Sequence, residues 1–323
     1  MVESPDSVGS WKRLDGVDLL RGAAIFFVLM NHVNMRLRIG HVSYGQGLPP
    51  QLLSALVWNA QYGVQIFFAV SGFLITSTSL RRWGTPSGMR PRDFYLLRFA
   101  RIAPLLLLLL AVLVLLHFTQ SKWFFVQERV GGLGWALFAA LTFHVNVLEA
   151  HRGYLPGNWD VLWSLSVEET FYLIFPLVCL WLGRGRWLLV LLAACVIVGP
   201  FARTVLAHDN EVWREYSYLG GMDAIALGCL TALVVPRLRL SGRGAFAMCA
   251  VGAALMGFIL GFSMIGDQLG LPQTGLDMTL IALGTCLVMA SVAQAGLRVP
   301  VPARPLLWLG QRSYEIYLPT CSW

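Results

Sequence analysis

Residues 102–118 read IAPLLLLLLAVLVLLHF, an uninterrupted apolar run without Asp, Glu, Lys or Arg. A helix that crosses a bilayer needs about 20 mostly apolar residues, within a range of about 17–25. The run therefore predicts a transmembrane helix. Of the 323 residues, 57% are hydrophobic and 13% are charged, and the mean hydropathy is +0.65. Soluble domains have about 45–50% apolar and about 25% charged residues, so the composition also predicts an integral membrane protein.

Comparable apolar runs recur from end to end, with no polar block between them. Helix is their predicted state, because lipid offers no partner to open backbone groups and the alternating pattern of a membrane barrel is missing. We predict an all-α bundle of nine or ten transmembrane helices in one domain, 17–323, after a polar cytoplasmic segment, 1–16. The candidate spans are 17–35, 61–80, 102–118, 134–148, 162–182, 187–206, 219–235, 245–265, 276–295 and 306–323.

The segment 134–148 leaves the number of crossings open. It is short for a span and contains His144 and Asn146. The arginines bear on the same question, because Lys and Arg accumulate in cytoplasmic loops. Six arginines and one acid lie between positions 81 and 101. This loop is predicted to be cytoplasmic, like the amino terminus and the arginines at 184, 186, 237, 239, 243, 298 and 304, whereas the loop around Asp267 and Asp277 is predicted to be external. These assignments agree only if 134–148 does not cross, so a re-entrant or tilted element is the alternative.

The accumulation of arginine in cytoplasmic loops also explains the net charge of +7 and the pI of about 9.3. In a soluble protein such a balance would suggest nucleic acid as a partner, but here we predict none. The six cysteines lie mostly within apolar runs and form no Cys-x-x-Cys pair, so they predict helix packing and no metal site or disulfide framework.

Two ionisable residues, Arg21 and His32, lie in the stretch LLRGAAIFFVLMNHVNM of the first predicted span. Charged side chains inside a bilayer are costly, and they usually mark function. The two are eleven positions apart, which is about 16 Å along a helix and close to three turns, so they face one side. We predict that Arg21 forms the cationic entrance of a channel and that His32 is a proton acceptor at the other end of that channel. The alternatives are an arginine that extends to the interface and a histidine that is only packed against its neighbours.

Arg98 and Arg101 lie three positions apart on a helix that begins at the predicted cytoplasmic surface. Two guanidinium groups on one face suit phosphate oxygens, which they bind bidentately; an ordinary cytoplasmic arginine cluster is the alternative. Glu168 and Glu169 lie at or inside a later span, where carboxylates are costly unless they are paired. A glutamate there is predicted to orient and charge a catalytic histidine, and an interfacial capping segment is the alternative.

The stretch 62–76 contains Gly63, Ser71 and Gly72, small residues that let helices approach closely. A packing face and a binding role are equally compatible with this stretch alone.

Taken in order, these motifs resemble one family, acyltransferase family 3. The chain has an arginine and a histidine separated by ten residues in the first helix, then G-V-x-x-F-F-x-x-S-G-F, R-x-x-R before a proline, W-S-L-S-V-E-E-x-F-Y-L and S-Y-x-x-Y-L. The resemblance extends over about residues 14–318. Members of this family are membrane-bound O-acyltransferases that modify bacterial surface glycans, lipopolysaccharide, Nod factors and some macrolides.

The resemblance implies a multi-pass protein of the bacterial cytoplasmic membrane. Its donor substrate would be acetyl-CoA or another acyl-CoA, bound from the cytoplasm, with no permanently bound cofactor and no metal. The acceptor would be a hydroxyl of a carbohydrate, glycan or macrolide. Arg21 and His32 match the first-helix pair of the family, and Arg98 and Arg101 match its R-x-x-R. Glu168 or Glu169 is expected to hold the histidine tautomer or to neutralise arginine charge, and the base and covalent roles of His32 both stay open.

The chain departs from the family pattern at its carboxyl end. Relatives usually have a histidine after S-Y-x-x-Y-L-x, whereas Leu318 is followed here by Pro, Thr, Cys, Ser and Trp323. We therefore expect the transmembrane domain to be shortened at this end, with an independent natural terminus as the alternative, and we expect the form without an appended esterase-like domain. A proton-coupled transporter or flippase of a glycan or lipid precursor is the rival function, because buried Arg, His and Glu also form proton relays.

Overall fold

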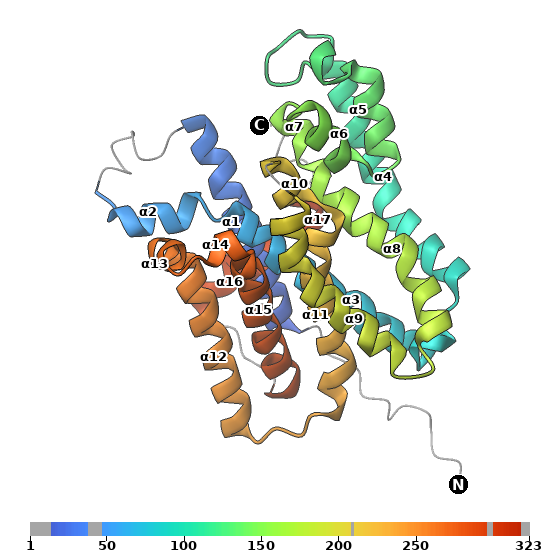
Figure 1. Cartoon of the computed structure of the whole chain (residues 1–323), viewed down its shortest axis with the longest axis vertical. Helices are drawn as coiled ribbons and strands as arrows, with labels where there is room; N and C mark the ends of the chain where they lie inside the picture. The colour runs from blue at the N-terminus through green and yellow to red at the C-terminus, as the bar shows by residue number, and fades with distance from the viewer. Residues whose placement is uncertain (1–13, 38–46, 208–209, 296–299, 318–323) are drawn as a thin grey trace.

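The computed structural model describes residues 14–37, 47–207, 210–295 and 300–317, and these residues form an all-α bundle (Figure 1). In this part of the chain, eight helical segments are long and apolar enough to cross a membrane. The predicted polytopic helix bundle is thereby confirmed. The eight are built on α1 (Asp15–Leu37), α3 (Ala60–Trp83), α4 (Pro91–His117), α8 (Leu162–Leu182), α9 (Trp187–Phe201), α11 (Tyr218–Val234), α12 (Gly242–Gly261) and α15 (Leu276–Ala295).

The number of spans differs from the predicted nine or ten at two places. The segment 134–148 is divided between α5 (Gly132–Leu141) and α6 (Val145–Arg152), and Phe143 between them has a positive φ of 58°. The buried Asn146 amide donates to the carbonyl of Tyr216, 3.0 Å away, which ties α6 to another element. A helix interrupted in this way is too short to span a bilayer, in agreement with the alternative of an element that does not cross.

The second difference lies in the predicted span 306–323. Here α16 (Arg304–Gln311) and α17 (Ser313–Tyr317) are separate short helices. Residues 318–323, with the departure from the family pattern, lie outside the described residues, as do residues 1–13 of the predicted amino-terminal segment.

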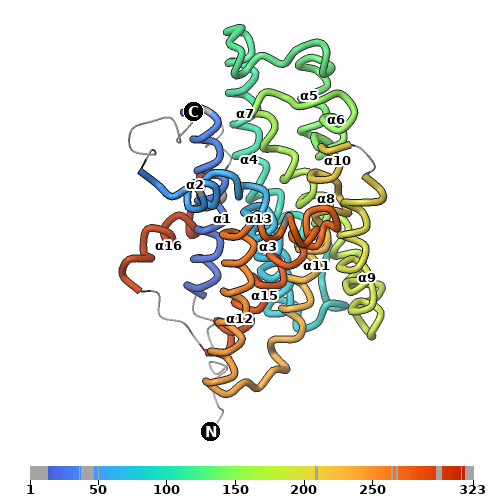
Figure 2. Tube along the Cα trace, turned by 60° about the vertical axis from the view of Figure 1, so that its left-hand side comes forward, coloured from blue at the N-terminus to red at the C-terminus, as the bar shows by residue number. Residues whose placement is uncertain are grey.

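The remaining helices are short and lie between or beside the spans (Figure 2). They are α2 (Pro50–Val57), α7 (Gly157–Asp160), α10 (Glu211–Tyr216), α13 (Ser263–Gln268), α14 (Leu271–Thr274), the 3-10 turns η2 (Pro86–Gly88), η3 (Glu128–Val130), η5 (Val235–Arg237) and η6 (Val301–Ala303), and a π-helical turn (Ala202–Leu206) that continues α9.

α3 is the central helix of the bundle. In its most apolar stretch 67% of the residues are buried, compared with 28% in α4, where Leu107, Leu108 and Leu115 face outward. α3 packs on α1, α11 and α15. Small residues allow the closest of these approaches: a Cβ at Gly72 would clash with the carbonyl of Ile225, and one at Gly228 with the carbonyl of Ala69. Of the two interpretations of the stretch 62–76, the structure supports the packing face at Gly72, because the two backbones touch where it lies.

One end of the bundle gathers most of the predicted cytoplasmic arginines. α1, α4 and α9 begin there and α3, α8 and α11 end there, and residues from five of these helices or from the turns beside them line one cavity. We call it the arginine-rich end, after Arg81, Arg82, Arg184, Arg186 and Arg237. Because 134–148 does not form a span, the arginine clusters after α3, α8 and α11 fall on the same side, as the charge pattern requires.

A buried ion pair joins three helices away from that end. Arg203, in the π-helical turn, binds Asp223 of α11 through two bonds of 3.0 and 2.7 Å. Its guanidinium also donates to the carbonyls of Gly275 and Gly220 and, at 2.6 Å, to the hydroxyl of Thr279 on α15. All three guanidinium nitrogens are therefore engaged with protein atoms.

Candidate functional site

Arg21 lies six residues into α1, about 9 Å from the start of the helix at 1.5 Å per residue. Asp15 and Asp18 occupy the first turn, where acidic side chains interact favourably with the helix dipole. The Arg21 guanidinium is 3.6 Å from the Asp18 carboxylate and donates to the Ser313 hydroxyl of α17. Its side chain is 13% exposed. An arginine is thus held inside the bundle by partners from both ends of the chain.

The contact with Ser313 depends on close packing between α1 and α16. A Cβ at Gly22 would clash with the carbonyl of Leu306, and one at Gly310 would clash with the carbonyl of Asp18. Figure 2 shows α16 beside α1, on the other side of the bundle from α9. Since α17 follows α16 after one residue, this approach brings Ser313 to Arg21.

Charged residues of α4 and α8 lie near Arg21. Arg101 and Glu168 both act electrostatically on its guanidinium. The guanidinium carbon of Arg98 lies 4.4 Å from the centre of the Tyr172 ring, a cation–π arrangement, and the Tyr172 hydroxyl donates to Glu168. We call Arg21, Arg98, Arg101, Glu168 and Tyr172 the charged cluster.

Glu169 borders this cluster and differs from Glu168 in its partners. Its side chain is buried, and Oε1 has no hydrogen-bond partner among the described residues. The charges that act on it belong to Glu168, Arg98 and Arg101. Both predicted glutamates are therefore brought next to the predicted arginines.

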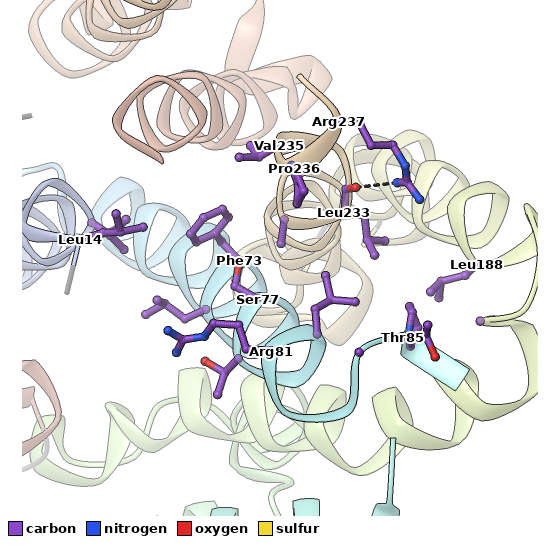
Figure 3. Close-up of a pocket in the computed structure, with 18 of the residues that line it drawn as sticks. Leu14, Phe73, Ser77, Arg81, Thr85, Leu188, Leu233, Val235, Pro236 and Arg237 are labelled. Carbon is purple, nitrogen blue, oxygen red and sulfur yellow. Dashed lines mark hydrogen bonds between the residues drawn. The ribbon is translucent and has the colours of Figure 1, made fainter. Parts of the chain in front are cut away.

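A cavity of about 820 Å³ opens at the arginine-rich end (Figure 3). Arg21 and Asp18 line it six and three residues after the first residue of α1, and apolar side chains such as Val17, Phe73 and Leu188 also line it. Of the described arginines, Arg21, Arg81 and Arg237 line the cavity, whereas Arg98 and Arg101 do not. Arg21 is thus shared between the cavity and the charged cluster.

His32 lies on α1 beyond the cavity. It is half-buried and stands eleven residues from Arg21, about 16 Å along the helix. The neighbouring Asn31 amide donates to the carbonyl of Val57, 2.7 Å away, which holds this part of α1 against α2. Glu168 acts electrostatically on Arg21, and Glu169 interacts with Glu168, Arg98 and Arg101.

Four residues of the site were not predicted: Ser313, Tyr172, Arg81 and Arg237. Ser313 and Tyr172 belong to motifs that the sequence analysis quoted, so their presence in the motifs was a usable signal. Arg81 and Arg237 were interpreted only as cytoplasmic arginines, and no pattern in the sequence indicates that they share a cavity.

A second group of acids lies at the opposite end, around α6, α7 and α10 (top of Figure 1). Glu149 is fully buried, and its Oε1 accepts from the Leu155 amide at 3.0 Å. Burial, and then the charge of Asp160, raise the pKa of the Glu149 carboxyl well above its usual range. Asp160 accepts from the Tyr216 hydroxyl at 3.2 Å, and the Tyr216 ring stacks on Trp163 with 4.0 Å between centroids.

Comparison with known proteins agrees with the motifs. The model of the family described as "Acyltransferase domain" matches residues 14–318. The peptidoglycan O-acetyltransferase OatA of Listeria monocytogenes is 27% identical over 96% of this chain and 49% of its own length. OatA of Staphylococcus aureus strain NCTC 8325 is 24% identical over 94% of the chain, and the putative peptidoglycan O-acetyltransferase YrhL of Bacillus subtilis is 26% identical over 94%.

The chain spans about half the length of these relatives. No solved structure matches it. The family match covers nearly all of the described helices and includes every motif that the sequence analysis singled out. This multi-pass membrane chain belongs to acyltransferase family 3.

Proposed function

We propose that the protein transfers an acyl group, specifically acetyl, from acyl-CoA to a hydroxyl of a glycan in the bacterial cytoplasmic membrane. The observation that carries this proposal is the cavity that Arg21 lines. The cavity combines a cationic group, which suits a phosphate-bearing donor, with apolar lining residues, and its volume is usual for a ligand site. The names of the relatives, peptidoglycan O-acetyltransferases, favour a peptidoglycan-type acceptor over a macrolide.

In this proposal, Arg21, Arg98 and Arg101 interact with the donor. Guanidinium groups bind phosphate oxygens through charge-assisted hydrogen bonds. Arg21 already makes such a bond to Ser313 and lines the cavity, so it meets the donor directly. Arg98 and Arg101 contribute positive charge from the adjacent cluster.

His32 is the proposed catalytic residue for the transfer of the acyl group from the donor's thioester. On the general-base route, its imidazole takes the proton of the acceptor hydroxyl while the hydroxyl oxygen attacks the thioester carbonyl. The carbon–sulfur bond then breaks, and the CoA thiolate takes up a proton. On the covalent route, the imidazole attacks the thioester carbonyl and the carbon–sulfur bond breaks, which releases the CoA thiolate. The acceptor oxygen then attacks the acyl-imidazole and displaces the imidazole, and the proton of the hydroxyl passes to the thiolate. Both routes give an ester and free CoA.

Glu168 is proposed to neutralise arginine charge. This role is supported by its electrostatic interaction with Arg21 and its hydrogen bond from Tyr172.

The test is an acyl-transfer assay with purified protein, acetyl-labelled acetyl-CoA and peptidoglycan fragments. Label should appear on the glycan with wild-type protein. His32→Ala should abolish the transfer, because the loss of a positioned base or nucleophile reduces the rate by about 10²–10⁴-fold. The variant should keep the wild-type elution profile and unfolding temperature. Full activity in the variant would rule out this role, and glycan transport without acyl transfer would favour the transporter.

A further inference from the structure

The mouth of the cavity is flanked by two arginines from helices far apart in the sequence. Arg81 lies in the last turn of α3, and Arg237 lies in η5, directly after α11. Figure 3 shows them on different sides of the cavity. The Arg237 guanidinium donates to the carbonyl of Leu233 at 2.7 Å, so its position is anchored to its own helix end. Both side chains are largely exposed to solvent.

The lining changes in character from the mouth inward. Hydroxyl groups of Ser77, Thr78 and Thr85 lie on the α3 side, followed by apolar side chains such as Phe73 and Leu74. Arg21 completes the lining. Phe73 precedes Arg81 by eight helical residues, about 12 Å. The cavity therefore has a cationic mouth, a mostly apolar passage and a further cationic group, Arg21.

We infer that Arg81 and Arg237 bind the phosphate groups of the donor's nucleotide end at this mouth. This rests on the proposed use of acyl-CoA. A CoA thioester has a phosphorylated adenosine diphosphate at one end and a long, weakly polar arm that ends in the thioester at the other. The order of groups in the cavity matches this order in the molecule: the nucleotide phosphates lie at the arginines of the mouth, and the arm extends along the apolar lining toward Arg21. Arg81 and Arg237 would then set the specificity for the phosphorylated donor.

Ordinary cytoplasmic arginines are the competing explanation, and the chain offers matched controls for it. Arg82 follows Arg81 on the same helix, is equally exposed, and has its guanidinium carbon 5.6 Å from the ring centre of Trp83. Arg239 lies two residues after Arg237 and is also exposed. Neither lines the cavity. Replacing these two removes as much charge from the same end without touching the mouth.

The experiment compares Arg81→Ala and Arg237→Ala with Arg82→Ala and Arg239→Ala. The donors are acetyl-CoA and its analogue without the 3′-phosphate, and CoA binding to the purified protein is measured by calorimetry. Loss of a charge-assisted phosphate contact should raise the donor KM and the Kd for CoA by about tenfold or more, with kcat little changed. At least one of the two variants should also lose the wild-type preference for the 3′-phosphorylated donor.

Equal donor KM and CoA affinity in all four variants would overturn the inference while leaving the proposed function intact, provided that the wild-type protein transfers acetyl groups. Wild-type protein that binds CoA but modifies no glycan would contradict the proposed function. The CoA affinities of the four variants would then still test whether Arg81 and Arg237 bind the donor. Wild-type protein that does not bind CoA would overturn both.

Discussion

Arg203 and Arg21 are both arginines inside predicted spans, yet their surroundings differ. Arg203 is 3% exposed, forms a bidentate pair with Asp223, and donates to two carbonyls and a hydroxyl. Arg21 is 13% exposed, lies 3.6 Å from its acidic neighbour, and lines a cavity of about 820 Å³. A guanidinium whose donors are all used by the protein has nothing left to offer a ligand. Burial of a charge therefore indicates function only where the protein leaves room beside it.

The largest effect on stability should come from breaking the ion pair between Arg203 and Asp223. Arg203→Ala leaves Asp223 fully buried without its counter-ion, which typically costs about 3–5 kcal/mol of stability. We expect poor yield or a much lower unfolding temperature in detergent, measured by light scattering and size-exclusion chromatography.

The matched control replaces both partners by leucine. Because no unpaired charge remains, Arg203→Leu combined with Asp223→Leu should be less destabilised than Arg203→Ala. A single variant as stable as wild type would show that the pair is not structural.

Replacement of Arg21 should reduce activity more than stability. Arg21→Ala should reduce kcat/KM for the donor by at least about tenfold, since each charge-assisted contact contributes about 1.5–3 kcal/mol. The unfolding temperature should change by only a few degrees, because Arg21 is not enclosed by partners as Arg203 is. Arg21→Lys, which keeps the charge but loses the forked geometry, should be intermediate. Collapse of Arg21→Ala during purification would remove the contrast between the two arginines.

Glu168→Gln tests how the charged cluster is used. Glutamine still accepts from Tyr172 but no longer carries the charge that acts on Arg21. If Glu168 neutralises arginine, kcat should change by less than about tenfold and the donor KM by a few-fold, as expected for about 1 kcal/mol. Glu169→Gln is the matched control at the next position. A loss of kcat by several orders of magnitude in Glu168→Gln would instead support a role in orienting the histidine.

The smallest effect concerns Glu149, a buried carboxyl whose charged neighbour is another acid. Its pKa is raised by burial and then by Asp160. The folded state therefore holds the proton more tightly than the unfolded state, and stability falls as pH rises above the ordinary carboxyl value of about 4.3. Between pH 5 and pH 8 the unfolding temperature of wild type should fall more than that of Glu149→Gln, measured by differential scanning fluorimetry. Parallel pH profiles would contradict the prediction.

The interrupted segment 134–148 shows where hydropathy is insufficient. Its apolar content was nearly enough for a span, whereas its length, His144, Asn146 and the arginine distribution of the loops argued otherwise. The break at Phe143 and the bond from Asn146 to the Tyr216 carbonyl involve a backbone conformation and a partner 70 positions away. No count of apolar residues contains that information.

The sequence by itself determined the membrane class, the helical state of the spans and the identity of most charged residues of the site. These follow from local properties, because the cost of placing a charge or an open backbone group in lipid is incurred residue by residue. Tertiary structure decided which of these charged side chains are enclosed by protein partners and which line a cavity. Ser313 reaches Arg21 across 292 positions because Gly22 and Gly310 let α16 pack closely on α1. Arg81 and Arg237 share one cavity because α3 and α11 end side by side, through backbone contacts at Gly72 and Gly228 that only the folded bundle defines.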